Sequence, residues 1–115
     1  MKVLCNLLTK KEFEIINKYK DILIYKYPEY IDSIILFGSK ARGESKKDSD
    51  IDLLITLKKY DWKIGDQIRR NGYELDEEID FKFSIFVVPY YHLELLEKEN
   101  IQFGLNIKND GIRIW

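Results

Sequence analysis

Two short apolar runs separated by a polar stretch constrain the fold of this 115-residue chain more than any other feature. The first run, residues 34–37, breaks abruptly at Gly38-Ser39, and the second covers residues 51–57. Apolar runs of about four to eight residues that end at a turn signal are typical of buried strands. We expect the two runs to pair side by side and antiparallel, so that the end of the first lies beside the start of the second.

The second run carries two carboxylates at its entrance, Asp50 and Asp52. Antiparallel pairing would place them next to Gly38 and Ser39. Alternate residues of a strand point to one face about 7 Å apart, so both carboxylates are expected to point at the same spot. Taken alone, the pair could equally cap and solubilise the entrance of the strand.

An EF-hand calcium loop is an alternative for Asp48, Asp50 and Asp52. That loop needs a glycine at its sixth position and a glutamate at its twelfth. This chain has Leu53 and Lys59 at those positions. The EF-hand alternative is therefore rejected.

The residue types around the break indicate phosphate chemistry. Paired carboxylates on a rigid strand form a hard oxygen site suited to Mg²⁺ or Mn²⁺, with substrate phosphates as further ligands. Gly38 lets the backbone approach a phosphate closely, and Ser39 can donate a hydrogen bond to it if its N–H opens a helix. Lys40 and Arg42 would add positive charge beside the same anion. Together these groups indicate nucleotidyl or phosphoryl transfer.

Composition limits the chain to one ordinary globular domain over residues 1–115. It is 45% hydrophobic and 34% charged, with a formal net charge of −1. The near-zero charge argues against generic nucleic-acid binding, and no apolar run is long enough to span a membrane. The single cysteine, Cys5, excludes an intramolecular disulfide, which fits a reducing cytoplasm. The aromatic residues are interpreted as core side chains rather than a stacking platform.

Capping, periodicity and turn signals predict the elements. Thr9 and Glu12 form a capping box ahead of a helix that Pro28 ends. The other expected elements are strands over 31–37 and 51–57, a short helical turn after residue 38, a helix over 62–71 that Asp61 caps and Gly72 stops, a third strand over 78–88 that Pro89 ends, helices over 91–99 and 101–108, and a last strand over 112–115. This order predicts an α/β (α+β) fold, a small mixed β-sheet with helices packed on it.

Gly38-Ser39, followed after ten residues by Asp50-Ile-Asp52, resembles the Gly-Ser…Asp-x-Asp signature of the DNA polymerase β nucleotidyltransferase superfamily. The string GSKARGESKKDSDIDLL and the tail NIKNDGIRIW are similar to its minimal branch, the MNT domains. The resemblance implies a polymerase β-like nucleotidyltransferase fold. It also implies that Asp50 and Asp52 are catalytic metal ligands and that Gly38, Ser39 and Arg42 bind the nucleotide.

Active members of the superfamily add a third carboxylate from the neighbouring third strand. Asp80 has the right chemistry for this catalytic place, and it lies on a predicted strand face shared with Lys82 and Ser84. Counting back from Pro89, however, the acid of the family falls nearer to Lys82 or Ser84. If either occupies that position, the metal site lacks a ligand.

The similarity to MNT antitoxins implies transfer of a nucleoside monophosphate from an NTP, with ATP expected, to a hydroxyl of a partner protein. The implied partner is a HEPN-type toxin, modified on a tyrosine. One alternative is an MNT-fold binding module that neutralises a toxin by contact. Another is a subunit that modifies a small molecule such as an aminoglycoside, although the chain has no room for a substrate domain. A homo-oligomer is left open, with Trp115 as a candidate contact.

Overall fold

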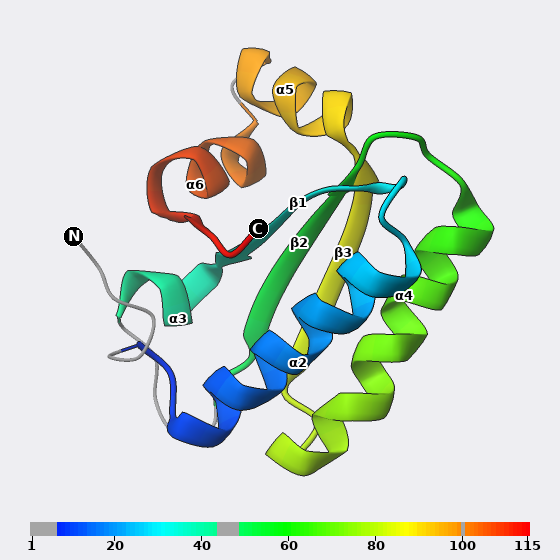
Figure 1. Cartoon of the computed structure of the whole chain (residues 1–115). Helices are drawn as coiled ribbons and strands as arrows, with labels where there is room; N and C mark the ends of the chain where they lie inside the picture. The colour runs from blue at the N-terminus through cyan, green and yellow to red at the C-terminus, as the bar shows by residue number, and fades with distance from the viewer. Residues whose placement is uncertain (1–6, 44–48, 100) are drawn as a thin grey trace.

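The computed structural model describes residues 7–43, 49–99 and 101–115. At its centre is a four-stranded sheet with the strand order β3-β2-β1-β4 (Figure 1). The strands are β1 (Ile31–Phe37), β2 (Ile51–Leu57), β3 (Phe83–Pro89) and β4 (Ile112–Arg113). β1 pairs antiparallel with β2 and β4, whereas β2 pairs parallel with β3, so the sheet is mixed as predicted. Cys5 lies outside the described residues.

Helices pack on both faces of the sheet (Figure 1). On one face lie α2 (Lys10–Lys26), which begins with the predicted capping box, and α4 (Trp62–Leu75). On the other lie α5 (Tyr90–Lys98) and α6 (Gln102–Asp110). The short α3 (Gly38–Arg42) directly follows β1, and the 3₁₀-helix η1 (Asp76–Ile79) joins α4 to β3. Within the described ranges, no helix has the length and apolarity that a membrane span requires.

The main hydrophobic core lies between the sheet and the pair α2 and α4. Its centre consists of side chains with 0% exposure, among them Leu23, Leu36, Leu53, Ile55 and Ile68. Burying an aliphatic side chain of this size contributes about 1.5–3 kcal/mol. A smaller cluster on the opposite face contains Phe37, Leu54 and Ile107. The central strands are nearly continuous in apolar residues because both of their faces are covered.

Gly72 does not stop the helix that precedes β3, because α4 continues to Leu75. This glycine is buried, and a Cβ on it would lie 2.3 Å from Ile85 Cδ1 and 2.9 Å from Tyr19 Cζ. Its role is therefore to let α4 pack closely on β3 and α2. Both a helix stop and a close approach require glycine, so the sequence alone could not separate them.

The third strand begins later than predicted, at Phe83. Residues 76–79 form η1, and Asp80 and Phe81 then take positive φ angles of 61° and 58°, which an extended strand cannot contain. Asp76 holds this turn from a buried position. Its carbonyl accepts the Phe81 N–H at 2.8 Å, and its Oδ2 accepts the Phe83 N–H at 3.2 Å.

Candidate functional site

The register between β1 and β2 builds the centre of the site. Phe37, the last residue of β1, pairs with Asp52, so Gly38 lies beside the Asp52 carboxylate. Gly38 has a φ of +76°, and a Cβ on it would lie 2.1 Å from Asp52 Oδ2. Glycine is therefore needed both for the backbone conformation and for the space that the carboxylate occupies. The predicted pairing of the two apolar runs, with Gly38 beside Asp52, is confirmed.

Asp52 is half-buried, and a negative charge (Asp50) and a positive charge (Arg42) both act on its carboxyl group. Burial raises the pKa of its carboxyl group, the negative charge of Asp50 raises that pKa further, and the Arg42 guanidinium lowers it. Asp50 is exposed just before β2, and Arg42 ends α3, whose second residue is Ser39. The structure thus brings Asp50, Asp52, Gly38, Ser39 and Arg42 to one end of the sheet.

The pair of carboxylates fits a divalent cation. The raised pKa of Asp52 reflects lost hydration and repulsion by Asp50, and a bound cation would relieve both. Carboxylate oxygens are also the ligands that Mg²⁺ prefers, and this ion takes its remaining ligands from water and substrate phosphates. Among the residues that the structure describes, no group of three or more His, Cys, Asp or Glu side chains is placed to hold a metal. Within this described part of the chain, the fit therefore rests on Asp50 and Asp52.

Ser84 stands where a third carboxylate would be expected. It pairs with Asp52 across the parallel strands β2 and β3, so the two side chains share one face of the sheet. Asp80 instead lies exposed in the left-handed turn before β3. The prediction that Asp80 shares a strand face with Lys82 and Ser84 is wrong, because that strand begins only at Phe83. A catalytic role for Asp80 stays a prediction.

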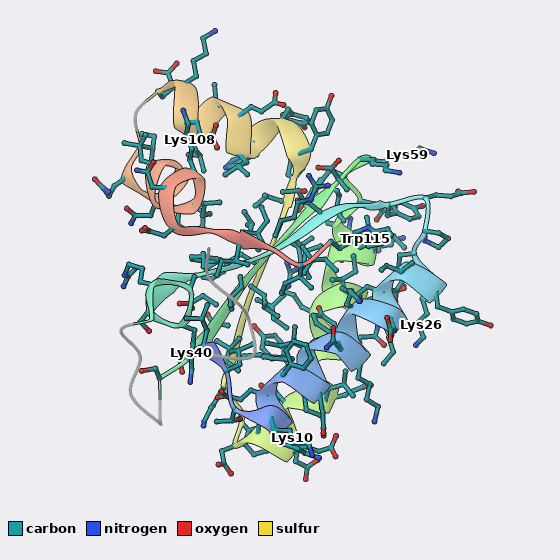
Figure 2. The ribbon with its side chains drawn as sticks, turned by 60° about the vertical axis from the view of Figure 1, so that its left-hand side comes forward. Lys10, Lys26, Lys40, Lys59, Lys108 and Trp115 are labelled. Carbon is teal, nitrogen blue, oxygen red and sulfur yellow. The ribbon has the colours of Figure 1, made fainter. Side chains whose placement is uncertain are left out.

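Lys40 does not contribute its charge to the site, contrary to the prediction. It is 3% exposed, and its Nζ lies 3.2 Å from Oε2 and 3.3 Å from Oε1 of Glu12, at the start of α2 (Figure 2). Lys82 Nζ approaches the same Oε2 at 3.6 Å, and the Thr9 N–H donates to Oε1. Burial would raise the pKa of Glu12, but the Thr9 hydrogen bond and the two ammonium groups hold it below its usual value. Lys40 therefore anchors α3 to α2.

The sequence profile described as the nucleotidyltransferase domain matches residues 16–109. The chain belongs to this family. The predicted enzyme class, nucleotidyltransferase, and the predicted superfamily are therefore confirmed.

Several proteins of Methanocaldococcus jannaschii resemble this nucleotidyltransferase, and all are named as candidate protein adenylyltransferases. MJ0604 is 31% identical over 102 residues, which cover 87% of this chain and 94% of that protein. MJ1217 is 55% identical over 42 residues, which cover 36% of this chain and 41% of that protein. For MJ1379 the match is 52% identical over 42 residues, and this chain spans only 40% of that relative.

Two solved structures share the fold of this nucleotidyltransferase. One is a chain from the crystal structure of a toxin-antitoxin with AMP-PNP, with a TM-score of 0.57 and 21% identity over 86% of this chain and 71% of that one. The other is a candidate nucleotidyltransferase from Sulfolobus solfataricus, with a TM-score of 0.53 and 20% identity over 89% of this chain and 78% of that one. At these identities the likeness shows the fold alone, which confirms the predicted fold class.

Proposed function

We propose that this nucleotidyltransferase moves a nucleoside monophosphate from an NTP, ATP in the first instance, to a hydroxyl of a partner protein in the cytoplasm. We further propose a tyrosine of a HEPN-type toxin as the acceptor. The observation that carries the proposal is the meeting of Gly38, Arg42, Asp50 and Asp52 at one end of the sheet. The names of the relatives, and the AMP-PNP of the toxin-antitoxin neighbour, support a protein acceptor and an adenine nucleotide.

Each residue of the site has a role in this reaction. Gly38 leaves the backbone open to the triphosphate, the Ser39 hydroxyl can donate to a phosphate oxygen, and Arg42 offsets phosphate charge. Asp50 and Asp52 would hold Mg²⁺ or Mn²⁺, which supplies charge neutralisation at the phosphates and a lower pKa at the attacking hydroxyl. The acceptor oxygen bonds to the α-phosphorus, the bond from that phosphorus to the bridging oxygen breaks, diphosphate leaves and the hydroxyl proton is lost to solvent.

The position of Ser84 favours a second candidate function. A serine hydroxyl is neutral and is a weaker Mg²⁺ ligand than a carboxylate, so the sheet face that Ser84 shares with Asp52 has less negative charge to hold an ion. A chain with such a site could keep nucleotide affinity and yet act mainly by contact. The alternative function is therefore a binding module that neutralises a toxin without modifying it.

Co-expression with a HEPN-type partner separates the two candidates. Mass spectrometry of the partner should show an added nucleotide with the wild-type chain and none with Asp50→Asn/Asp52→Asn, which keeps side-chain volume and removes charge. Transfer is contradicted if the partner stays unmodified while both chains suppress its toxicity equally. That result would establish the contact module instead.

A further inference from the structure

On the sheet face that α5 and α6 partly cover, successive side chains of β2 and β3 extend from Asp52 and Ser84 toward the other end of the sheet. In the register of β2 and β3, Asp52 pairs with Ser84 and Leu54 pairs with Phe86. Ser84 and Phe86 are two residues apart on one strand, so they point to the same face roughly 6.6 Å apart. Phe86 is therefore the next outward-pointing side chain of β3 beyond the position that faces Asp52.

Phe86 is held in place by aromatic neighbours and yet is 42% exposed. Its ring centroid lies 5.8 Å from that of Phe37 on β1 and 5.9 Å from that of Phe103 on α6. Phe37 and Phe103 are themselves in edge-to-face contact at 5.4 Å. Such tilted contacts favour a defined ring orientation, and the exposed part of Phe86 offers an aromatic surface to solvent.

The exposed aromatic surface of Phe86 lies next to the candidate phosphate site. Phe37 immediately precedes Gly38 and is only 9% exposed, so the aromatic cluster adjoins the Gly38 and Asp52 site directly. In every nucleotide one sugar separates the phosphates from the base. With phosphates beside Gly38 and Asp52, a sugar lying over Ser84 brings the base to Phe86.

We propose that Phe86, supported by Phe37 and Phe103, is the stacking surface for the base of the bound nucleotide. This inference rests on the proposed nucleotidyltransferase function and adds a subsite for the base to the phosphate site. Stacking on an aromatic ring uses the flat face of a base and tolerates changes at its edges. ATP and GTP should therefore bind with similar affinity, and both should bind more tightly than UTP or inorganic triphosphate.

The test is calorimetry in Mg²⁺ with ATP and with inorganic triphosphate, which has no base. Phe86→Ala should weaken ATP binding ~5- to 150-fold, the range expected for loss of one stacked base, and leave triphosphate binding unchanged. Phe86→Trp should keep ATP affinity. Phe81→Ala is the matched control, because Phe81 is 68% exposed and lies before β3, and it should change neither affinity.

The outcomes separate the two proposals. Wild-type protein that binds neither ATP nor triphosphate overturns the proposed function and the base subsite together. Wild-type protein that binds ATP no more tightly than triphosphate overturns the base subsite alone, and so does a Phe86→Ala variant with unchanged ATP affinity or an equal loss of both ligands.

A second measurement does not depend on the folding of Phe86→Ala. Stacking on a phenyl ring should shift the adenine H2 and H8 proton resonances upfield when ATP binds the wild-type protein. The milder variant Phe86→Leu, which keeps an apolar side chain, should remove that shift. An upfield shift that persists in Phe86→Leu places the base elsewhere.

Discussion

The carboxyl group of Asp52 is half-buried beside Gly38, and Asp50 adds like charge to its surroundings. Its pKa is therefore higher in the folded protein than in the unfolded chain, so the folded state holds this proton more tightly. By linkage, the ionised group lowers the free energy of unfolding at neutral pH, and stability is regained as the pH falls through the raised folded pKa. The feature that suits Asp52 to a cation thus makes the cation-free protein less stable.

Asp52→Asn tests this linkage. The variant should unfold at a higher temperature than the wild type at pH 7, by ~4 °C for each kcal/mol gained. Scanning calorimetry should show the difference shrinking as the pH falls, because the wild-type carboxyl becomes protonated. Metal-dependent ATP binding should be lost in the same variant. A variant that is less stable than the wild type at pH 7 would contradict the assigned cause of the raised pKa.

Substitution of Ser84 allows the converse experiment, in which a metal-ligating side chain is added to the site. Ser84→Asp would place a third carboxylate opposite Asp52, so Mg²⁺ affinity in the presence of ATP should rise roughly tenfold or more, because charge count sets affinity in oxygen-ligand sites. Without metal, the variant should be less stable because three like charges would share the site. Ser84→Asn is the isosteric control and should not increase affinity. Equal Mg²⁺ titrations for both variants would show that residue 84 does not face the ion.

At the scale of single elements, β1 and β2 were predictable to their exact bounds. Each strand is mostly apolar, and residues that a strand interior avoids flank it, Gly38 after β1 and Asp50 before β2. The start of β3 was not predictable in this way. It depends on two successive left-handed residues, Asp80 and Phe81, of which only aspartate is common in that conformation. It also depends on hydrogen bonds that the buried Asp76 accepts from the Phe81 and Phe83 N–H groups.

The candidate site also contains one feature that the local sequence pattern predicts and one that depends on a distant residue. Gly38 beside Asp52 follows from strand pairing, which the local pattern sets. The orientation of Lys40 does not, because its partner Glu12 is 28 positions away and belongs to another helix. Sequence proximity to Arg42 made Lys40 look like a phosphate ligand, whereas burial and charge pairing direct it inward.

Two glycines of α4 give a matched pair of substitutions. A Cβ at Gly65 would meet Val87 Cγ1 at an ordinary 3.6 Å, so Gly65→Ala should stabilise the protein by about 0.5–1 kcal/mol through helix propensity. At Gly72 the Cβ would overlap Ile85 and the Tyr19 ring, so Gly72→Ala should destabilise by about 1–3 kcal/mol. Urea unfolding measures both. Equal stabilisation by the two variants would contradict the close packing at Gly72.

The ion pair between Glu12 and Lys40 joins α2 to α3. Glu12→Gln leaves Lys40 buried without a counter-charge and should cost about 3–5 kcal/mol. Adding Lys40→Met removes the more deeply buried of the two ammonium groups that face Glu12, so the double variant should be more stable than Glu12→Gln alone. Unfolding free energies of the single and double variants form the cycle that measures this coupling. If the changes in unfolding free energy of the two single variants add up to that of the double variant, Glu12 and Lys40 are not coupled.

At the scale of the whole molecule, strand directions explain how so short a chain builds a site. β1 runs antiparallel to β2, and β2 runs parallel to β3, so the end of β1 and the starts of β2 and β3 meet at one end of the sheet. That end carries Gly38, Asp52 and Ser84. The helices on both faces pack against the sheet.

The charge of the whole molecule bears on which acceptors and partners are plausible. Positive and negative residues nearly cancel, to a formal net charge of −1. Figure 2 shows well-separated positions for Lys10, Lys26, Lys59 and Lys108. Nucleic-acid affinity without sequence preference depends on neutralising several neighbouring phosphates at once. Four lysines as far apart as these, in a molecule of net charge −1, do not provide this.

We therefore expect no generic binding of RNA or DNA. Fluorescence anisotropy with a labelled single-stranded oligonucleotide at ~150 mM salt should give a dissociation constant weaker than ~10⁻⁴ M, the weak end of non-specific binding. Titration of the same sample at low salt is the control, because any residual attraction between scattered lysines and phosphates should appear there. Low-micromolar binding that persists at ~150 mM salt would reveal a local basic groove. A nucleic-acid hydroxyl would then rival a protein side chain as the acceptor.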